Sequence, residues 1–567
     1  MTSLPSPPAA TWRRDLLGLA LLFGALYFFC LGRAPLDNPD EGRYAEIPRE
    51  MLATGDWVTP RLDGINYFEK PPLVYWAIAA SFRVFGPGER AARAIPALFG
   101  LGGVLLTYGA ARRLYGRPTG LASAVVLGSS ALYAALSRIL TLDIGVSVLM
   151  TATLCCFLLG MNEPPGRRRR WYFYGLYVSA ALATLAKGLM GFMLTGAVMV
   201  LWLSLGGQWR RLRPFYLPTG LLLFLALALP WHLLAAARNP TWAHFYFIHE
   251  HWERFTKDTH GRYQPWYYFI PILLGGLFPW IGFLGLGVRT ALAGGWARRR
   301  DHADRWFWII WPAFVFLFFS KSQSKLATYI LPVFPPLAVV IGLGLAPVWQ
   351  SGAVAPIRRG VQLFGMIAGV LAVAILLAVT IPGRFRIDPA EVAGLQTSAW
   401  ALAAILFGGV AASIWALRRG DGRAALAALL VTILLFIGSL APITGVLPGY
   451  HPSTKAVAQF ARQNARPGDR IYFYANFYHD FLYYSQLPAG GVGVHTDEVE
   501  LENDPTQAGR FIEGPEFLRA WAGPGRILVL GERSNEFMQR LLTEPAFLRR
   551  NHLLAQTRDF YLFSNEP

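Results

Sequence analysis

Charged residues are scarce in this chain, and their scarcity excludes an ordinary soluble protein. Only 15% of the 567 residues are Asp, Glu, Lys or Arg, whereas soluble domains carry about 25%. Hydrophobic residues make up 54%, and the mean hydropathy is +0.36. Many apolar runs approach or exceed the roughly 18 residues that cross a bilayer. The sequence therefore predicts a polytopic α-helical membrane protein.

Cysteines and acidic residues are also few. Cys30, Cys155 and Cys156 all fall inside apolar runs, which argues against a disulfide framework or a set of metal ligands. The chain has 34 acidic against 52 basic residues, a net charge of +18. In a soluble protein this excess would suggest nucleic-acid binding. Here many basic residues lie in short loops between apolar runs, where they orient a membrane protein instead. We expect a lipid bilayer as partner and no nucleic acid.

The apolar runs predict about thirteen transmembrane helices. Positive flanks stay cytoplasmic, so Arg13 and Arg14 place the N-terminus inside, and the densest later Arg clusters fall on the same side. The first apolar run has no clear cleavage pattern and is interpreted as a retained span. The predicted transmembrane domain covers residues 1–449. Its outer loops are residues 33–90, 236–267 and 320–328.

The composition changes near Tyr450, which predicts a second domain over residues 450–567. A helical pattern is followed by a β-rich aromatic run, and RILVLG at 526–531 has the pattern of a buried strand. SNEFMQRLL is typical of a helix, and the final DFYLFS of a strand. We expect a small water-exposed α/β domain on the outer side. It carries no metal, nucleotide or nucleophile motif.

The first outer loop is polar, acidic and aromatic, unlike the rest of the chain. It reads LDNPDEGRYAEIPREMLATGDWVTPRLDGINYFEKPPLVYW over residues 36–76. Charges held next to a span are costly and mark functional sites, although a solvated loop is the alternative. IPREMLATG has amphipathic spacing and predicts a short helix at the membrane surface. Asp40, just ahead of it, is either a helix N-cap or a site carboxylate.

A second carboxylate and two lysines lie at the outer ends of other spans. Asp143 begins the fourth predicted span, where it either caps that helix or joins Asp40 in one cavity. Lys321 and Lys325 are four residues apart, so a helix would place them on one face. With Tyr329 they suit a phosphate, because ammonium groups offset its charge. The alternative for the lysines is snorkelling at the membrane edge.

A metal site is a weaker candidate. His249, from the histidine-rich second outer loop, and Glu69, from the first, could share a divalent ion such as Zn, Mg or Mn. Two ligands from distant loops are a weak signal. The chemistry expected below requires no cofactor.

These segments together resemble a known family. The 36–76 motif and SKSQSKLATYILPVFPPLA, which begins at Ser320, are similar to segments of the aminoarabinose lipid A transferases of Gram-negative bacteria. Those enzymes are polyprenyl-phosphate-dependent glycosyltransferases of the GT-C fold, related to protein O-mannosyltransferases. The resemblance covers the first ten predicted spans, and the later part of the chain matches in layout more than in motif. It implies a GT-C membrane domain with a periplasmic α/β domain at its C-terminus.

The resemblance also implies a reaction and a place for it. The donor would be 4-amino-4-deoxy-L-arabinose linked to undecaprenyl phosphate, and the acceptor a lipid A phosphate. The enzyme would be a multi-pass protein of the bacterial inner membrane, with its N-terminus in the cytoplasm and its C-terminal domain in the periplasm. Masking an acidic phosphate with a cationic sugar would reduce the attraction of cationic peptides, which implies polymyxin resistance.

Roles for single residues follow from the resemblance and from the spacing above. Asp40 and Asp143 would be the catalytic carboxylates. The expected donor-phosphate ligands are Arg43, Lys70, Arg254, Lys321 and Lys325. The expected cavity residues are Glu41, Tyr44, Tyr67, Glu69 and Tyr329.

The expected chemistry suits these side chains. Cations at a lipid phosphate stabilise it as a leaving group. The acceptor phosphate is already ionised, so a strong general base is less necessary. Asp40 and Asp143 would therefore mainly orient the sugar, pair its ammonium group or stabilise oxocarbenium-like charge, with Asp40 as a base the second choice.

Three alternatives stay open. One is the same fold transferring another sugar from a polyprenyl phosphate to lipid A, a glycan or a protein. Another is a lipid or polyprenol transporter, although paired halves with broken helices are not evident in the sequence. The third is a receptor whose outer domain binds the ligand. The sequence leaves the oligomeric state open.

Overall fold

The computed structural model describes residues 9–248, 263–382, 389–443, 452–494, 509–544 and 550–567. The contacts divide the chain into two compact units. Unit 1 comprises Met1–Leu31 and Arg93–Thr444, and unit 2 comprises Gly32–Ala92 and Gly445–Pro567. The first outer loop thus groups with the C-terminal residues rather than with the helices on either side of it in sequence. The predicted functional division at residue 450 stays a prediction.

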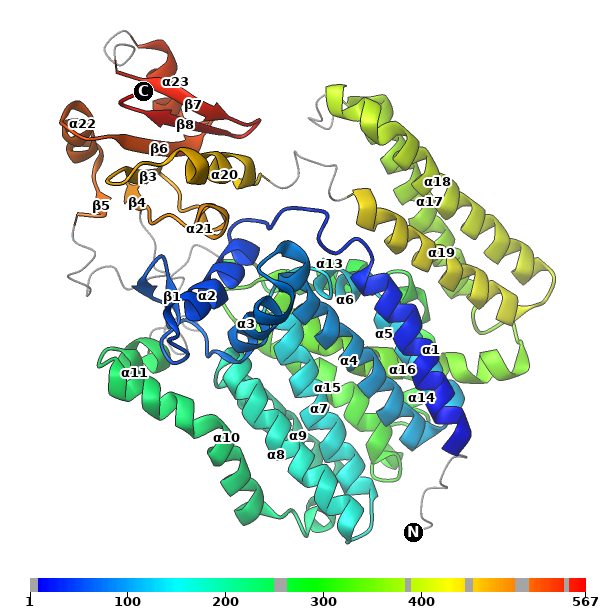
Figure 1. The fold of residues 1–567 in the computed structure, drawn as a ribbon. Helices are drawn as coiled ribbons and strands as arrows, with labels where there is room; N and C mark the ends of the chain where they lie inside the picture. The colour runs from blue at the N-terminus through cyan, green and yellow to red at the C-terminus, as the bar shows by residue number, and fades with distance from the viewer. Residues whose placement is uncertain (1–8, 249–262, 383–388, 444–451, 495–508, 545–549) are drawn as a thin grey trace. The chain divides into compact units, whose positions relative to one another are not determined.

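Unit 1 is built of helices (Figure 1). Seven helices in the described part of the chain are long and apolar enough to cross a membrane. A broken pair, α13 (Phe269–Gly276) with Trp280–Ala291, passes the same test but bends by 94°. A helical membrane protein is thereby confirmed, and the number thirteen stays a prediction. The seven are α4 (Glu89–Tyr115), α7 (Asp143–Asn162), α10 (Leu217–Arg238), η5 with α16 (Ala327–Ser351), α17 (Arg358–Thr380), α18 from Gly394 to Arg418, and α19 (Gly422–Ile443).

The other helical segments of unit 1 are shorter or less apolar. They fall on the remaining predicted spans and the loops between them. They are α1 (Ala9–Phe28), α5 (Arg117–Ser129), α6 (Ala131–Leu136), α8 (Arg167–Lys187), α9 (Met190–Gly206), η1 (Trp209–Leu212), α11 (Trp242–His244), η3 (Trp280–Phe283), α14 (Leu284–Ala291), η4 (Trp296–Arg298) and α15 (Ala303–Lys321).

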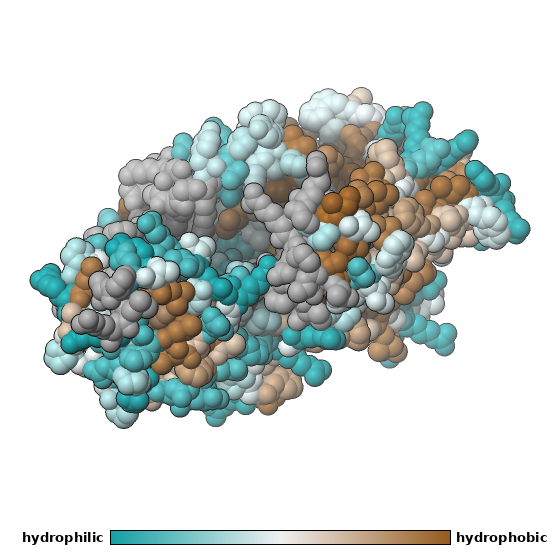
Figure 2. All heavy atoms as spheres, turned by 90° about the horizontal axis from the view of Figure 1, so that it is seen from above, coloured by the Kyte–Doolittle hydropathy of each residue, from teal (hydrophilic) through white to brown (hydrophobic). Residues whose placement is uncertain are grey.

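The buried core of unit 1 centres on α16 (Phe334–Ser351). The apolar window of Ala327–Ser351 is 94% buried, whereas that of α17 is only 22% buried. A Cβ on Gly342 would lie 2.3 Å from the Ser123 hydroxyl, so α5 and α16 approach closely through a small residue, as helices in membranes commonly do. Figure 2 shows apolar side chains on the surface of the helical part. A helix that is apolar but little buried inside the protein suits contact with lipid.

The C-terminal part of unit 2 is an α/β sheet, as predicted (Figure 1). The strand order is β5-β4-β3-β6-β8-β7. The first four strands are parallel, and β8 and β7 are antiparallel additions at one edge. The predicted strands at 526–531 and at the final DFYLFS are confirmed. The bounds are β3 (Arg470–Tyr474), β4 (Gly490–Val492), β5 (Phe511–Ile512), β6 (Ile527–Glu532), β7 (His552–Gln556) and β8 (Phe560–Ser564).

Helices cover the sheet of unit 2. Phe517 of α22 (Gly514–Ala522) and Met538 of α23 (Glu536–Thr543) join one buried core with Tyr472 of β3. The next residue along β3, Phe473, points to the other face, and its ring contacts Phe481 of α21 (His479–Ser485) at 5.4 Å between centroids. The helical patterns at 455–464, now α20 (Lys455–Asn464), and in SNEFMQRLL are confirmed.

One secondary-structure prediction for the C-terminal domain was wrong. The aromatic run after Pro467-Gly468 was expected to be β-rich, but within residues 470–486 β3 is the one strand and the helix α21 follows it. All seven residues of α21 are buried. Aromatic residues fit a buried helix as readily as a strand, and a short apolar run does not distinguish the two by its pattern.

The outer-loop part of unit 2 contains the predicted amphipathic helix. It is α2 (Asp40–Thr54), which begins at Asp40 and ends before Gly55 in a left-handed conformation, φ 71°. After it come the short antiparallel hairpin β1 (Arg61–Leu62) and β2 (Ile65–Asn66), and then α3 (Leu73–Phe85). The predicted position of this helix at a membrane surface stays a prediction.

Candidate functional site

The first cluster of predicted site residues lies on α2. The Arg43 guanidinium forms an ion pair with the Asp40 carboxylate one turn earlier in the helix. The Arg43 side chain is only 4% exposed, whereas that of Asp40 is 47% exposed. The N-cap residue of α2 is Pro39, and no side chain caps the helix. The N-cap alternative for Asp40 is therefore wrong, because its carboxylate pairs with the buried Arg43 guanidinium instead of capping the helix.

Aromatic rings surround that buried cation. The Arg43 guanidinium carbon lies 5.1 Å from the centroid of the Tyr44 ring and 5.9 Å from that of Tyr67, within the range of cation–π attraction. Burial raises the pKa of both phenols well above the usual value, so both keep their proton as possible donors. Tyr75 of α3 adds a third ring, 6.2 Å from Tyr44.

Glu69 and Lys70 are the next predicted pair. Both are buried, with 4% and 8% of their surface exposed. The Lys70 ammonium donates to the Glu69 carbonyl at 2.9 Å and approaches its carboxylate at 3.5 Å. The motif thus holds a second buried cation in unit 2. Among the neighbouring residues, Glu41 is buried as well, and its carboxylate accepts the Asp37 N–H at 3.0 Å.

The second cluster lies in unit 1 around Asp143. Asp143 is the first residue of α7, and its carboxylate forms an ion pair with the ammonium group of Lys187, the last residue of α8. The N-cap of α7 is Leu142, without a side-chain bond, so the capping alternative for Asp143 is also wrong. The Lys187 ammonium lies 4.8 Å from the centroid of the Tyr329 ring. The three side chains bring together α7, α8 and η5 (Ala327–Val333).

Sequence reasoning missed Lys187 as a site residue. A signal was present, because Lys187 is the only charged residue between Arg170 and Arg210. Such residues in apolar surroundings are rarely without a role. Its pairing with Asp143, 44 positions away, could be found only from the fold.

Lys321 and Lys325 do not share a helix face. The helix α15 ends at Lys321, and the backbone is extended at Ser322 and at Leu326. Lys321 is exposed, whereas Lys325 is buried and donates to the carbonyls of Gln264, at 2.6 Å, and Ser322. Burial lowers the pKa of the Lys325 ammonium. The prediction from their spacing was wrong, because the helix stops between them.

The predicted metal pair and one predicted cation fall on residues outside the described part of the chain. His249 and Arg254 both lie there, so their roles stay predictions. Within the described residues, no group of three or more His, Cys, Asp or Glu side chains could hold a metal ion. Asp40 and Asp143 belong to different units, so their meeting in one cavity stays a prediction as well.

The chain is similar to known membrane transferases. The profile of the family described as dolichyl-phosphate-mannose-protein mannosyltransferase matches residues 69–233. An undecaprenyl phosphate-alpha-4-amino-4-deoxy-L-arabinose arabinosyl transferase of Edwardsiella ictaluri is 33% identical over 64% of this chain and 65% of its own length. The protein of the same name from Aeromonas salmonicida is 31% identical over 70% of each chain. The matches thus span about two thirds of the curated relatives.

A solved structure is similar over nearly the whole chain. The crystal structure of ArnT from Cupriavidus metallidurans bound to undecaprenyl phosphate has a TM-score of 0.83 and 26% sequence identity. The similarity covers 98% of each chain. It therefore includes both the helical unit and the C-terminal α/β residues.

Proposed function

The chain belongs to the family of undecaprenyl phosphate-aminoarabinose arabinosyltransferases, which are membrane enzymes of the GT-C fold, and on this premise we propose that it modifies lipid A. It transfers 4-amino-4-deoxy-L-arabinose from undecaprenyl phosphate to a lipid A phosphate. The observation that carries the proposal is the similarity, over 98% of this chain, to ArnT bound to undecaprenyl phosphate. The modification would confer resistance to polymyxin and other cationic peptides.

We further propose the arrangement in the membrane. About thirteen helices cross the bacterial inner membrane, the N-terminus is cytoplasmic and residues 450–567 are periplasmic. The reaction then takes place at the outer face, where both lipid substrates present their phosphates. Asp40 and Asp143 are the catalytic carboxylates, and each is paired with a cation, Arg43 and Lys187 respectively. Arg254 contributes a further cation to the binding of the donor phosphate.

The chemistry follows from the charges of these side chains. A phosphate oxygen of lipid A attacks the anomeric carbon of the sugar, and the bond from that carbon to the undecaprenyl phosphate oxygen breaks. The leaving phosphate gains negative charge, which Arg43 and Lys70 stabilise because buried cations act strongly where water is excluded. The acceptor phosphate carries no proton that must be removed. Asp40 and Asp143 orient the amino sugar and stabilise positive charge on its ring.

Mass spectrometry of lipid A tests the function. Cells that express the chain should show lipid A with a mass increment of one aminoarabinose on phosphate, and cells without it should not. A different increment would identify another sugar and favour the same fold with another donor. Unchanged lipid A together with altered distribution of polyprenyl phosphate across the membrane would favour the transporter instead.

The role of Asp40 has its own test. Asp40→Asn should lower turnover of the purified enzyme by about 10²–10³-fold while leaving binding of the undecaprenyl phosphate-linked donor largely intact, because the amide keeps the shape and loses the charge. Equal loss of binding and turnover would contradict the proposed electrostatic role. A divalent ion at Glu69 and His249 is tested separately by turnover after treatment with a chelator and after adding back Zn, Mg or Mn.

A further inference from the structure

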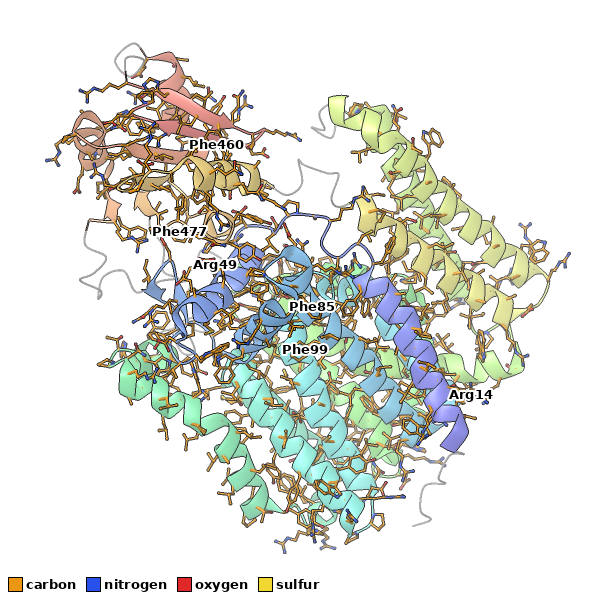
Figure 3. The ribbon with its side chains drawn as sticks, viewed as in Figure 1. Arg14, Arg49, Phe85, Phe99, Phe460 and Phe477 are labelled. Carbon is orange, nitrogen blue, oxygen red and sulfur yellow. The ribbon has the colours of Figure 1, made fainter. Side chains whose placement is uncertain are left out.

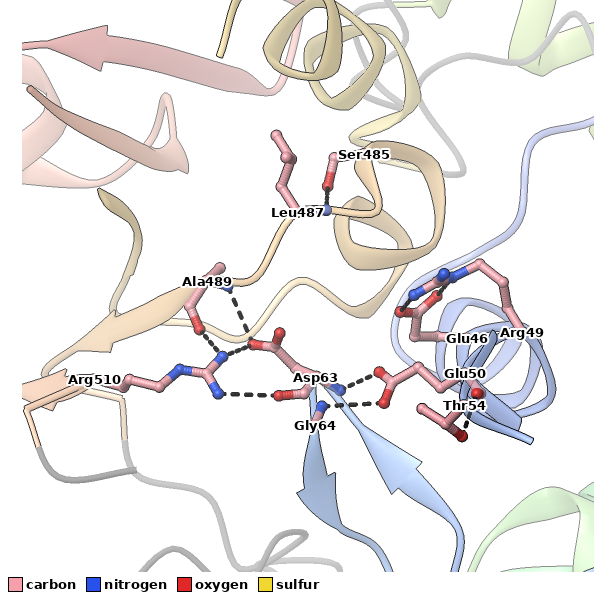
Figure 4. A network of polar contacts seen from close by, with 10 residues as sticks. All are labelled: Glu46, Arg49, Glu50, Thr54, Asp63, Gly64, Ser485, Leu487, Ala489 and Arg510. Atoms are coloured by element: carbon pink, nitrogen blue, oxygen red, sulfur yellow. Dashed lines mark hydrogen bonds and ion pairs between the residues drawn. The ribbon is translucent and has the colours of Figure 1, made fainter. Parts of the chain in front are cut away.

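The turn of the β1–β2 hairpin is held by ionisable side chains on two sides (Figure 4). On one side, the Glu50 carboxylate of α2 accepts the N–H groups of Asp63, at 2.5 Å, and Gly64, at 3.0 Å. On the other side, the Asp63 carboxylate pairs with the Arg510 guanidinium and accepts the Ala489 N–H at 3.2 Å. Glu50, Asp63 and Arg510 thus form a continuous chain from α2 to the C-terminal sheet.

Arg510 has three partners in this network. Besides the Asp63 carboxylate, it donates to the Asp63 carbonyl at 3.0 Å and to the Ala489 carbonyl at 2.8 Å. The residue directly precedes β5, at the edge of the sheet, and β4 follows Ala489. A planar guanidinium presents several donors in a fixed fork, so it can bind the hairpin and the sheet at once.

The two central residues of the hairpin turn both have a left-handed backbone conformation. Asp63 and Gly64 both have positive φ, 57° and 76°, as the two central residues of a type I′ turn require. In this conformation both N–H groups face Glu50. The carboxylates of Glu50 and Asp63 are buried to the same degree, with 8% of each residue exposed.

The other end of α2 is held by the same C-terminal part of the chain. A Cβ on Gly42 would lie 2.4 Å from the Asp480 backbone nitrogen, so the first turn of α2 rests directly on α21. The Asn38 side chain accepts the His479 N–H at 2.9 Å. The Leu36 N–H donates to the Tyr484 hydroxyl at 2.7 Å. Contacts to C-terminal residues therefore flank the segment that carries Asp40 and Arg43.

The outer loop has little means of holding itself in place. Its two strands have two residues each, and a single hairpin of that size is not stable alone in water. The helix α2 has 15 residues and contains Pro48, and a helix of this length is marginal without packing. Its direction must therefore come from the surfaces on which it packs, which are those of α3 and α21 and, at the hairpin end, the residues around Arg510.

We propose that the C-terminal domain positions α2 for the transfer reaction, and that Arg510 is the positioning residue at the hairpin end. The domain then contributes to catalysis without touching the reacting atoms, by fixing the direction of Asp40 and Arg43. The catalytic part of this inference rests on the proposed function, whereas the tethering of the hairpin does not. It gives a role to a domain that carries no catalytic motif in its sequence.

The test measures tethering and activity in the same full-length protein, reconstituted in lipid nanodiscs. Arg510→Gln should increase hydrogen exchange of the backbone amides of residues 61–66 and of the last turn of α2 by at least about tenfold. Turnover should fall on the order of 10²-fold, as expected when a catalytic group is displaced by about 1 Å. Donor binding should fall less than turnover.

Two arginines of the same domain serve as matched controls. Arg526 forms a buried ion pair with Asp469 at 3.0 Å, and Arg540 forms an exposed pair with Glu544 at 2.5 Å. Arg526→Gln should raise exchange in β3 and β6 without raising it at residues 61–66. Arg540→Gln should change neither exchange in the hairpin nor turnover. If Arg526→Gln matches Arg510→Gln in both measurements, the effect is general loss of stability and the positioning role is refuted.

A double variant distinguishes loss of the contact between Asp63 and Arg510 from a general loss of stability. Asp63→Asn combined with Arg510→Gln should lose no more turnover than Arg510→Gln alone, because both changes break one contact. Additive losses would overturn the inference, and so would unchanged exchange at residues 61–66 in Arg510→Gln. If lipid A from cells that express the chain shows no aminoarabinose increment while Arg510→Gln frees the hairpin, the proposed function fails and the tether stands.

Discussion

The two carboxylate–cation pairs of the candidate site are built in opposite ways. Asp40 and Arg43 are neighbours one turn apart on α2, and the exposure of their side chains differs sharply, 47% against 4%. Asp143 and Lys187 come from different helices, and their side chains are buried to a similar extent, 14% and 18% exposed. A local pair keeps its geometry with its helix, whereas a pair between helices depends on how α7 and α8 pack. The first therefore needs its helix to be positioned, and the second needs its core to be intact.

The largest expected effect comes from neutralising the carboxylates of Asp40 and Asp143. Asp40→Asn and Asp143→Asn should each lower kcat by about 10²–10³-fold, as the loss of a preorganised electrostatic group does. The double variant should lose little more than the more damaging single variant if both groups act in one step. Single-turnover assays with the undecaprenyl phosphate-linked donor measure this. Asp301→Asn, at an exposed position, is the control, and fully additive losses would place the two carboxylates in separate steps.

Breaking the pair between helices should reduce both activity and stability. Lys187→Met leaves the Asp143 carboxylate without its cation in a mostly buried place, which costs about 3–5 kcal/mol for a buried pair. We expect a lower thermal unfolding temperature and a loss of turnover of about 10²-fold. Lys455→Met is the matched control, because Lys455 pairs with Glu89 while 39% of its side chain is exposed. Similar shifts in unfolding temperature for both variants would show that burial of the pair does not matter.

A smaller effect should follow from overpacking the contact between α21 and α2, the helix that carries Asp40 and Arg43. Gly42→Ala places a methyl group 2.4 Å from the Asp480 nitrogen, so α2 and α21 must separate. Such overpacking costs about 1–3 kcal/mol. Gly514→Ala, where the added methyl group meets nothing within 4 Å, should be neutral or stabilising. Thermal unfolding of the two purified variants measures the difference. An unchanged unfolding temperature in Gly42→Ala would mean that α2 does not pack against α21.

The smallest effect for a single group concerns pH. Burial raises the pKa of Asp63 to about 7 and that of Glu50 to about 8. Glu46 adds to both shifts, whereas Arg510 opposes the first and Arg49 the second. The folded protein thus holds more protons than the unfolded chain between the ordinary pKa values, near 4, and these raised ones. The free energy of unfolding should therefore fall as pH rises towards 8.

Between pH 6 and pH 8 each of the two groups should contribute a loss of about 1–2 kcal/mol, since one unit of pKa corresponds to about 1.4 kcal/mol. The double variant Asp63→Asn with Glu50→Gln should flatten this dependence while keeping the shape of both side chains. Denaturant unfolding of the reconstituted protein at several pH values measures it. A stability that rises with pH over this range would contradict the assignment of these two groups.

Much of the fold could be predicted because periodic patterns determine local structure. The apolar runs predicted helices where α7, α10 and α17 lie, and the amphipathic spacing after Asp40 predicted α2. A continuous apolar run after Gly-Pro-Gly predicted β6, and the final DFYLFS predicted β8. Predictions that needed a continuous element across a loop failed. Lys321 and Lys325 were placed on one helix, and the backbone is extended between them.

The sequence by itself determined that this is a helical membrane protein with an acidic loop over residues 36–76 and a C-terminal α/β domain, because composition and period are local properties. It also supplied the motifs that resemble the transferase family. Only the tertiary structure decided that Lys187 pairs with Asp143, and that the outer loop packs with residues 445–567 rather than with the adjacent helices. The physical reason is that burial and ion pairing depend on which surfaces come into contact in the fold. Residues hundreds of positions apart, such as Asp63 and Arg510, form an ion pair that no local sequence pattern indicates.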